Sequence, residues 1–145
     1  MARPKIRHIA LHTPDVEKTA EFYKTVFEME EVGRTDSPLA TGVYLSDGYL
    51  NLAVLNFKSA AAADRLDGLG PVMGLHHFGF ACEDLDEIRK RLADSETPLR
   101  TDLPAAGNTG YFEEKYVGPE SVMLDISHGW LTEKRKKAEE AAAAR

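Results

Sequence analysis

The sequence predicts an α+β fold built from two copies of one unit, in which a strand and a helix precede three further strands. Segment 8–15 aligns without a gap with segment 77–84, which lies 69 residues further along the chain. In both segments a histidine leads three apolar or small residues, and a final aspartate precedes an amphipathic helix. A repeat of this length within 145 residues indicates two copies of one supersecondary unit.

Length and composition are those of a compact single domain. The 145 residues suit one domain, and an apolar content of 43% is typical of globular proteins. The net charge of −6 argues against nucleic acid as a partner, because nucleic-acid binding needs a basic face. Cys82 is the one cysteine, which indicates a reducing compartment. No apolar run approaches the roughly 20 residues of a membrane span, and no apolar signal segment follows the N-terminus. We therefore expect a soluble cytoplasmic protein.

The first unit, over residues 5–58, opens with a strand from Lys5 to His12. Strand alternation would place His8 on one face together with Ile6 and Ala10. The residues that follow suit a helix start: a threonine that can cap, a proline for the first helical position and an acid for the positive end of the helix dipole. The helix is expected to bury a stripe at helical spacing, formed by Val16, Ala20, Tyr23 and Phe27. Strands are then predicted over 28–35, 39–45 and 49–57, with a tight turn at 46–48.

The second unit, over residues 75–128, follows a linker at 59–74 that contains a short helical turn in the Ala60–Ala63 run. Its helix is predicted over 83–94, with Leu85, Ile88 and Leu92 buried. The remaining strands are predicted at 98–102, 111–117 and 122–127, with a loop at 104–110. Residues 1–131 would then form one domain, followed by a charged helical or frayed tail at 132–145 to which we assign no function.

In each unit one polar residue interrupts the apolar run of the last strand. Asn51 stands between two leucines, and Asp125 stands between Leu124 and Ile126. A buried carboxylate in apolar surroundings needs a partner, which a metal or a histidine would supply. If the duplicated units lie side by side, His8 and His77 would share a cleft with these two residues. Two imidazoles, a carboxylate and open positions suit a divalent metal with room for water or substrate.

The sequence resembles the vicinal oxygen chelate superfamily, which includes glyoxalase I, methylmalonyl-CoA epimerase, extradiol dioxygenases and the fosfomycin- and bleomycin-resistance proteins. The first half carries the resemblance in His-Ile-Ala-Leu from His8 and in an Asp-led helix with Glu-Phe-Tyr from Glu21 and Val-Phe-Glu-Met from Val26. The second half carries it in segments 74–80 and 118–126. The resemblance implies paired βαβββ modules in a cupped, barrel-like mixed sheet and a homodimer. It also implies a divalent metal (Fe, Mn, Co, Ni or Zn) at His8, Asn51, His77 and Asp125.

Two of these positions depart from the superfamily pattern. The last ligand of the superfamily is usually glutamate, whereas Asp125 is one methylene shorter. Asn51 replaces the first-half acid of glyoxalase I, and a neutral amide there is more similar to the glutamine of the epimerase. Asn51 is shorter than glutamine, so it would bind the metal through water or not at all. These departures weaken the glyoxalase I interpretation.

Other residues have a functional and a structural interpretation. One of Glu113 and Glu114 should face inward, where a glutamate near a metal could be the general base, although solvated edge charges are commoner. His76 should point to the face opposite His77, and Tyr49 shares the Asn51 face. His128 could reach the cleft mouth, and Trp130 could cover the edge of the core. The structural alternatives are a core histidine at position 77, an arginine partner for the aspartate at 125 and a hydrogen-bonded strand residue at 51.

Three functions remain open from the sequence. The first is a metal-dependent isomerase, epimerase or lyase, in which the metal stabilises an anionic intermediate of a small oxygenated substrate. The second is an Fe(II) extradiol-type dioxygenase, because two histidines and one carboxylate suit non-haem iron. Such dioxygenases usually carry more of these modules than 145 residues allow. The third is a small-molecule binding protein of the bleomycin-resistance type, in which the metal positions are usually lost.

Overall fold

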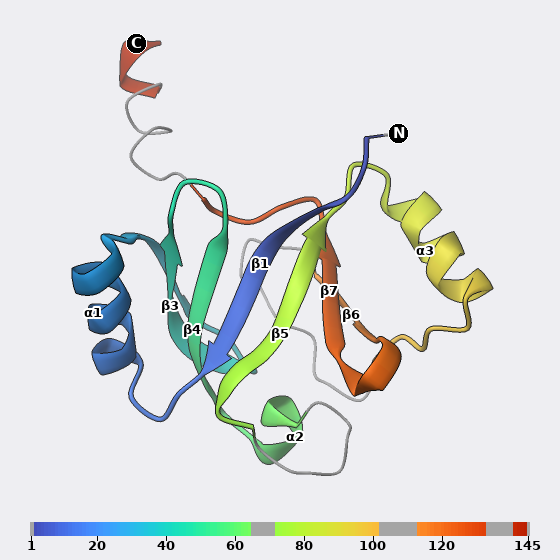
Figure 1. Ribbon diagram of the computed structural model, residues 1–145, viewed down its shortest axis with the longest axis horizontal. Coiled ribbons are helices and arrows are strands. Elements are labelled where there is room, and N and C mark those ends of the chain that lie inside the picture. Colours follow the sequence, from blue (N-terminus) through green and yellow to red (C-terminus); the bar gives the residue numbers. More distant parts are fainter. Residues whose placement is uncertain (1, 65–71, 102–112, 133–140, 145) are drawn as a thin grey trace.

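The computed structural model describes residues 2–64, 72–101, 113–132 and 141–144. Its elements are β1 (Lys5–His12), α1 (Val16–Phe27), β2 (Glu30–Asp36), β3 (Ala40–Ser46), β4 (Asn51–Phe57), α2 (Ala60–Ala63), β5 (Gly74–Ala81), α3 (Leu85–Asp94), β6 (Glu114–Val117), the 3-10 helix η1 (Pro119–Ser121) and β7 (Met123–Ser127). The described strands form one seven-stranded mixed sheet in the order β2-β3-β4-β1-β5-β7-β6. This confirms the predicted α+β fold (Figure 1).

The pairing of the strands relates the two halves of the sheet. β1 pairs with β4 in parallel, and β5 pairs with β7 in parallel. β1 and β5 are antiparallel to each other and join the halves at the centre of the sheet. In Figure 1 these two strands lie in the middle, with α1 and α3 at opposite ends of the sheet. The first strand and the last strand of each half are therefore neighbours, which brings residues far apart in the sequence into one row.

Strand alternation separates an outer face under the helices from an inner face. In β4, Leu52 and Val54 pack with Ala20 of α1, whereas Ala53 and Leu55 belong to a second apolar cluster on the opposite face. In the other half, Leu85 of α3 packs with a third cluster that also contains Cys82, Tyr116 and Ile126. The long helices thus cover outer-face residues, and the inner face is left for the polar residues of the candidate site.

The start and the end of α1 differ from the sequence prediction. The helix cap is Asp15, whose carboxylate accepts a hydrogen bond from the Lys18 amide at 3.1 Å. Thr13 lies further back, and its hydroxyl accepts a hydrogen bond from the Asp15 amide. The prediction that Phe27 is buried is wrong, because its side chain is 62% exposed. The helix ends there, and Met29 packs against the outer-face cluster instead.

Two register shifts in the β1–β5 pairing change which side chains share a face. The first shift lies between Ile6 and His8, so Ile6 is exposed and does not share the buried face of His8 as alternation predicted. At the second shift Ala10 pairs with His77 and Leu11 pairs with Leu75, which leaves His76 as an extra residue in β5. This bulge brings the Nδ1 atoms of His76 and His77 to 2.8 Å. The prediction that the two rings lie on opposite faces is therefore wrong.

The remaining elements lie close to their predicted positions. Within the strand predicted at 98–102, the described residues 98–101 form only an isolated bridge between Leu99 and Tyr116. The loop predicted at 104–110, and most of the tail, lie outside the described residues. Within the parts of the chain that the structure describes, no helix has the length and apolar character needed to cross a membrane.

Candidate metal centre

The candidate site is built on one row of paired residues that crosses five strands. Asn51 of β4 pairs with His8 of β1, and His8 pairs with Gly79 of β5. Gly79 pairs with Asp125 of β7, which in turn pairs with Lys115 of β6. Residues that pair directly across neighbouring strands point to the same face. The row therefore collects an amide, an imidazole, a carboxylate and an ammonium on the inner face of the sheet.

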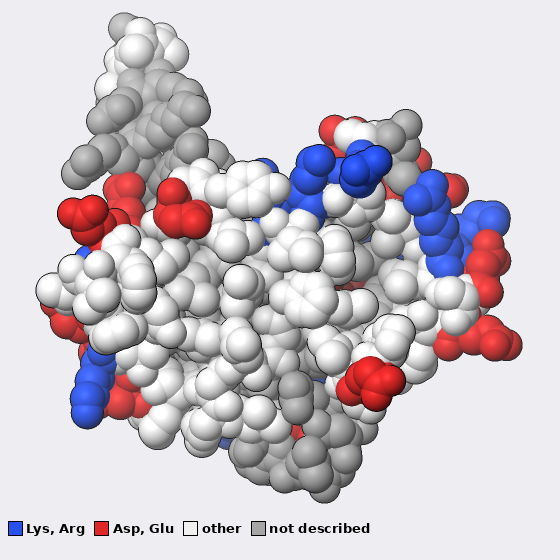
Figure 2. Space-filling model, viewed as in Figure 1, with Lys and Arg blue, Asp and Glu red and all other residues white. Residues whose placement is uncertain are grey.

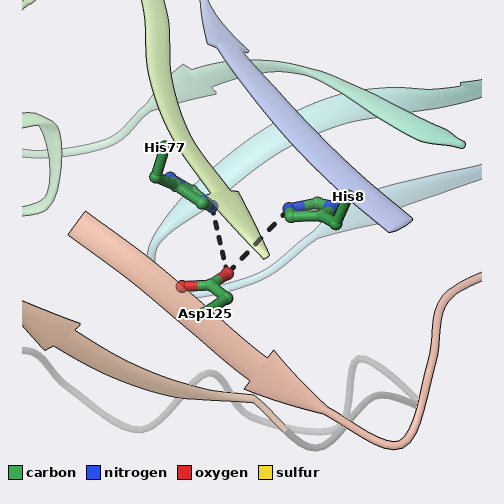
Figure 3. Close-up of side chains that lie close together, drawn as sticks. All are labelled: His8, His77 and Asp125. Atoms are coloured by element: carbon green, nitrogen blue, oxygen red, sulfur yellow. Dashed lines mark ion pairs between the residues drawn. The ribbon is translucent and has the colours of Figure 1, made fainter. Parts of the chain in front are cut away.

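Three side chains converge at the centre of this row (Figure 3). The Asp125 Oδ2 atom lies 3.0 Å from His77 Nε2 and 3.9 Å from His8 Nε2. Each of the three residues offers one ligand atom, and these atoms lie within 4.8 Å of one another. All three residues are buried, and Asp125 is 0% exposed. Two imidazole nitrogens and a carboxylate oxygen thus surround one buried point.

A hydrogen bond to Asn51 determines the tautomer of His8, and so which ring nitrogen carries the proton and which turns a lone pair toward Asp125. The Asn51 amide donates from Nδ2 to the Leu131 carbonyl at 2.8 Å, so its Oδ1 is left as an acceptor. This oxygen lies 2.8 Å from His8 Nδ1, which must carry the donated proton. Burial, with a smaller effect of the charge of His77, lowers the pKa of His8 to about 3, so the ring is neutral. Its unprotonated Nε2 therefore faces the carboxylate.

The bulged His76 orients His77 in the same way. His76 Nε2 lies 2.7 Å from the Ala63 carbonyl and donates its proton there. Burial, followed by the charge of His77, lowers the pKa of His76 to about 3, so its Nδ1 is an acceptor. The 2.8 Å contact then requires His77 Nδ1 to donate. The Nε2 of His77 is left to face Asp125 and can hold either a proton or a metal cation.

These orientations fit a divalent metal. The lone pair of His8 Nε2 faces an electron-rich oxygen at 3.9 Å, a contact that a cation between the two atoms would make favourable. Burial alone would raise the pKa of Asp125, but the charges of His77 and Lys115 outweigh it and lower that pKa, so the carboxylate is ionised. Imidazoles whose second nitrogen is hydrogen-bonded to a neighbour are typical of metal ligands. His8, His77 and Asp125 would hold the metal, and Asn51 would stand behind His8.

Lys115 and Glu113 add a second pair of charges beside the three converging residues. Lys115 Nζ lies 2.8 Å and 2.9 Å from the two oxygens of Asp125 and 3.7 Å from Glu113 Oε2. Burial alone would lower the pKa of Lys115, but Asp125 and Glu113 raise it, so the amine stays charged. The Trp130 indole donates to Glu113 Oε1 at 2.6 Å. Burial, followed by the charge of Asp125, raises the pKa of Glu113.

Gly79 leaves the space in which these side chains meet. A Cβ atom at this position would lie 2.8 Å from the Trp130 ring and 3.1 Å from Asp125 Cβ. With no side chain there, the Trp130 ring stacks on the His8 ring, with 4.6 Å between the ring centroids and 9° between the planes. Trp130 therefore covers His8 on one side and binds Glu113 at its edge.

A cavity with about 50 Å³ of free space adjoins the site, which is room for a few water-sized groups. Its polar end is formed by His8, His77, Glu113 and Lys115. The rest of the lining is mostly apolar and comes from the first half of the chain: Leu39, Ala40, Ala53, Leu55 and Phe57, with Thr35, Ser37 and Tyr44. The converging residues are thus open to a small ligand with a polar and an apolar part.

The structure separates the remaining predicted residues. Glu113 lines the cavity, whereas Glu114 points to the opposite face and binds Arg89 and the Tyr116 hydroxyl. Tyr49 is exposed beneath the Arg7 guanidinium rather than in the cleft. His128 is exposed and lies 3.3 Å from the Cys82 carbonyl, away from the site. The structural alternative named an arginine as the partner of Asp125, whereas the cation beside Asp125 is Lys115.

Sequence reasoning missed the roles of Lys115, His76 and Gly79. Only Lys115 had an available signal, because alternation places it on the same strand face as Glu113. The bulge that turns His76 toward His77 leaves no periodic pattern.

The chain belongs to the glyoxalase/bleomycin resistance protein/dioxygenase superfamily, whose family model matches residues 5–115. This is the superfamily that the sequence resemblance indicated, so that prediction is confirmed. Among curated protein sequences, none matches the chain significantly.

Solved structures with the same fold cover almost the whole chain. A hypothetical protein from Bacillus halodurans C-125 has a TM-score of 0.70 at 17% identity, over 92% of this chain and 100% of its own. A variant methylmalonyl-CoA epimerase from Streptomyces coelicolor, in complex with 2-nitronate-propionyl-CoA, has a TM-score of 0.67 at 21% identity, over 91% and 99%. The methylmalonyl-CoA epimerase from Mycobacterium tuberculosis has a TM-score of 0.67 at 17% identity, over 92% and 91%. At these identities the likeness concerns the fold.

The hydrogen bond from His77 to His76 predicts that His76→Phe weakens metal binding. Phenylalanine keeps a ring beside Phe57 but removes the acceptor that orients His77. We expect the affinity for Co(II) or Zn(II) to fall about 10- to 100-fold, which is the usual effect of removing the hydrogen-bond partner of a metal-bound histidine. Competition with a chromophoric chelator measures this, with circular dichroism as the check of folding. His128→Phe is the matched control and should bind as wild type does. Equal affinities in all three proteins would refute this role of His76.

Proposed function

We propose that this chain is a metal-dependent enzyme of the isomerase, epimerase or lyase type, which acts on a small oxygenated substrate. The observation that supports this proposal most strongly is the arrangement of His8, His77 and Asp125. Both imidazoles present Nε2 to one buried carboxylate oxygen, and separate hydrogen bonds hold both Nδ1 atoms. A bound divalent metal would act there as a Lewis acid on a substrate oxygen.

Glu113 is the proposed general base. Its carboxyl lines the same cavity as both histidines, and the Trp130 indole holds one oxygen while the other is 3.7 Å from Lys115. A raised pKa brings the carboxyl closer to neutrality, which suits a group that takes a proton and returns it. The proton would come from a carbon next to a carbonyl group. Because structural neighbours are methylmalonyl-CoA epimerases, methylmalonyl-CoA is the first substrate to test.

An Fe(II) dioxygenase of the extradiol type is the second candidate, and one observation favours it. Both ends of the Asn51 amide are engaged, at His8 and at the Leu131 carbonyl. The chain would then supply three ligands, two histidines and one carboxylate, which is the ligand set of non-haem Fe(II) oxygenases. The identity of the bound metal distinguishes the two candidates.

Metal analysis of purified protein tests the common part of both candidates. Protein prepared without chelator or affinity metal should contain near-stoichiometric metal by plasma mass spectrometry. His77→Ala and Asp125→Ala should lose it, because each removes one of three ligands, whereas His128→Ala should keep it. Iron would favour the dioxygenase, and Co, Ni, Mn or Zn would favour the isomerase or lyase. Wild-type protein that takes up none of these metals would leave the binding-protein alternative.

Glu113→Gln should slow proton transfer strongly while metal stays bound. In D₂O the metal-loaded enzyme should exchange the C2 proton of methylmalonyl-CoA for deuterium. Proton NMR measures the rate of this exchange, which is compared with the spontaneous rate without enzyme. We expect the variant to be slower by about 100-fold or more, the usual contribution of a general base. Glu114→Gln is the control, because the neighbouring Glu114 side chain points to the opposite face and binds Arg89. The wild-type rate should rise with pH through the raised pKa of Glu113, because only the carboxylate accepts a proton. Exchange at the wild-type rate in metal-loaded Glu113→Gln would exclude this base.

We also propose that the chain forms a homodimer through the outer face of β1 and β5. Ile6, Ile9, Leu75, Phe78 and Val122 line an apolar groove of about 430 Å³ on this face, and Leu75 is 68% exposed. Figure 2 shows that the charged groups gather at the edges of this face, with few over its centre. Exposed apolar patches of this kind are typical of protein interfaces. A second copy would bury the same patch on both chains.

Leu75→Glu should convert the dimer into a monomer, because it would bring two glutamates into an apolar interface. Light scattering coupled to gel filtration would show the change as a halved molar mass. Phe27→Glu, a similarly exposed apolar position on α1, is the control and should remain dimeric. A wild-type protein that stays monomeric at high concentration would rule out this interface.

A further inference from the structure

We propose that Lys115 is a substrate-binding residue, and that its ammonium makes the site select small carboxylates over neutral molecules of the same shape. This inference rests on the proposed function, since it concerns the same cavity. It adds the chemical class of the substrate and assigns a role in ligand binding to Lys115, which otherwise serves as the ion-pair partner of Asp125.

The contacts of Lys115 leave it able to bind a further anion. Its Nζ atom contacts both oxygens of Asp125, at 2.8 Å and 2.9 Å. An ammonium has three N–H donors, so these two contacts leave one. Glu113 Oε2, at 3.7 Å, is beyond hydrogen-bond distance. Because Lys115 lines the cavity beside His8 and His77, the remaining donor is available to a ligand there.

The balance of charges also favours an anionic ligand. With a divalent metal at Asp125, the metal and Lys115 bring three positive charges, against at most two negative charges from Asp125 and Glu113. Burial makes uncompensated charge costly. A carboxylate that enters the cavity would offset the excess, whereas a neutral ligand would leave it.

The ammonium of Lys115 occurs in only one of the two halves of the duplicated sheet. Lys115 pairs with Asp125 in the second half, and the corresponding pair in the first half is Ser46 with Asn51. Ser46 donates to the Leu50 carbonyl at 2.8 Å and accepts from the Gly48 amide, within its own turn. The fold therefore accommodates an uncharged residue opposite the neutral Asn51, and the ammonium is found only in the half that carries the buried carboxylate.

The walls of the cavity limit the rest of the ligand. Apart from its charged end, the lining includes Leu39, Ala53, Leu55 and Phe57. The free space of about 50 Å³ suits a carboxylate head with a short apolar group. The substrate class is thus a small acid with a second oxygen near the carboxylate, so that metal and Lys115 bind it together.

A matched pair of probes tests this proposal. 2-Hydroxybutanoate and 2-hydroxybutanamide have nearly the same shape and differ by one charge. Isothermal titration calorimetry on Co(II)-loaded wild-type protein should show the acid bound at least about tenfold more tightly. Lys115→Met should reduce that preference by about tenfold, as expected for a charge-assisted hydrogen bond. Lys115→Arg should keep most of it, and Lys58→Met, which removes a surface lysine paired with Asp36, should change nothing.

Each outcome decides the proposal separately from the proposed function. A Lys115→Met protein with the wild-type preference would overturn the proposal. A wild-type protein that binds acid and amide equally, or that binds neither, would also overturn it. Metal content and thermal unfolding, measured on the same samples, show whether the variant is folded and loaded. Should Lys115→Met fail to fold, Lys115→Gln removes the charge while keeping a donor. The metal content distinguishes the two failures: a wild-type protein that takes up no metal refutes the proposed function, whereas a loaded protein without the preference refutes only the role of Lys115.

Discussion

The buried carboxylate of Asp125 is the constraint on which the site depends. Its side chain is fully buried, and its pKa is lowered because His77 and Lys115 outweigh the effect of burial. An ionised carboxylate in such a place is stable only with cationic or hydrogen-bonding partners. The sheet supplies them from β5 and β6, while Gly79 of β5 leaves room for the side chains that meet there.

Duplication of the fold explains why the partners converge, and the differences between the halves explain what the site can do. In each half the first strand runs parallel to the last strand. His8 therefore lies beside Asn51, and β5, which carries His77, lies beside β7, which carries Asp125. The first half contributes most of the apolar wall of the cavity, and it also contributes the amide that orients His8. The second half contributes the carboxylate, the ammonium and Glu113. Charge is thus concentrated on one side of the cavity, and apolar surface on the other.

Much of the fold could be predicted, because burial and strand alternation act locally. The repeat of a histidine-led strand and an aspartate-led helix located both halves, and the polar interruptions at Asn51 and Asp125 identified inward positions. His8 and His77 followed from their equivalent places in the repeat. The distinction between Glu113 and Glu114 could not be made, since a shift of one residue in a short strand exchanges their faces.

Sequence alone predicted the family, the order of most elements and three residues of the candidate metal centre, because each depends on a pattern along the chain. Tertiary structure decided how those residues are oriented and what else joins them. The bulge at His76 depends on how β5 pairs with β1, and the ion pair of Lys115 with Asp125 depends on the register of two other strands. The stacking of Trp130 on His8 joins residues at opposite ends of the chain. The bulge and the stacking have no periodic signature, because they arise only when distant segments pack against each other.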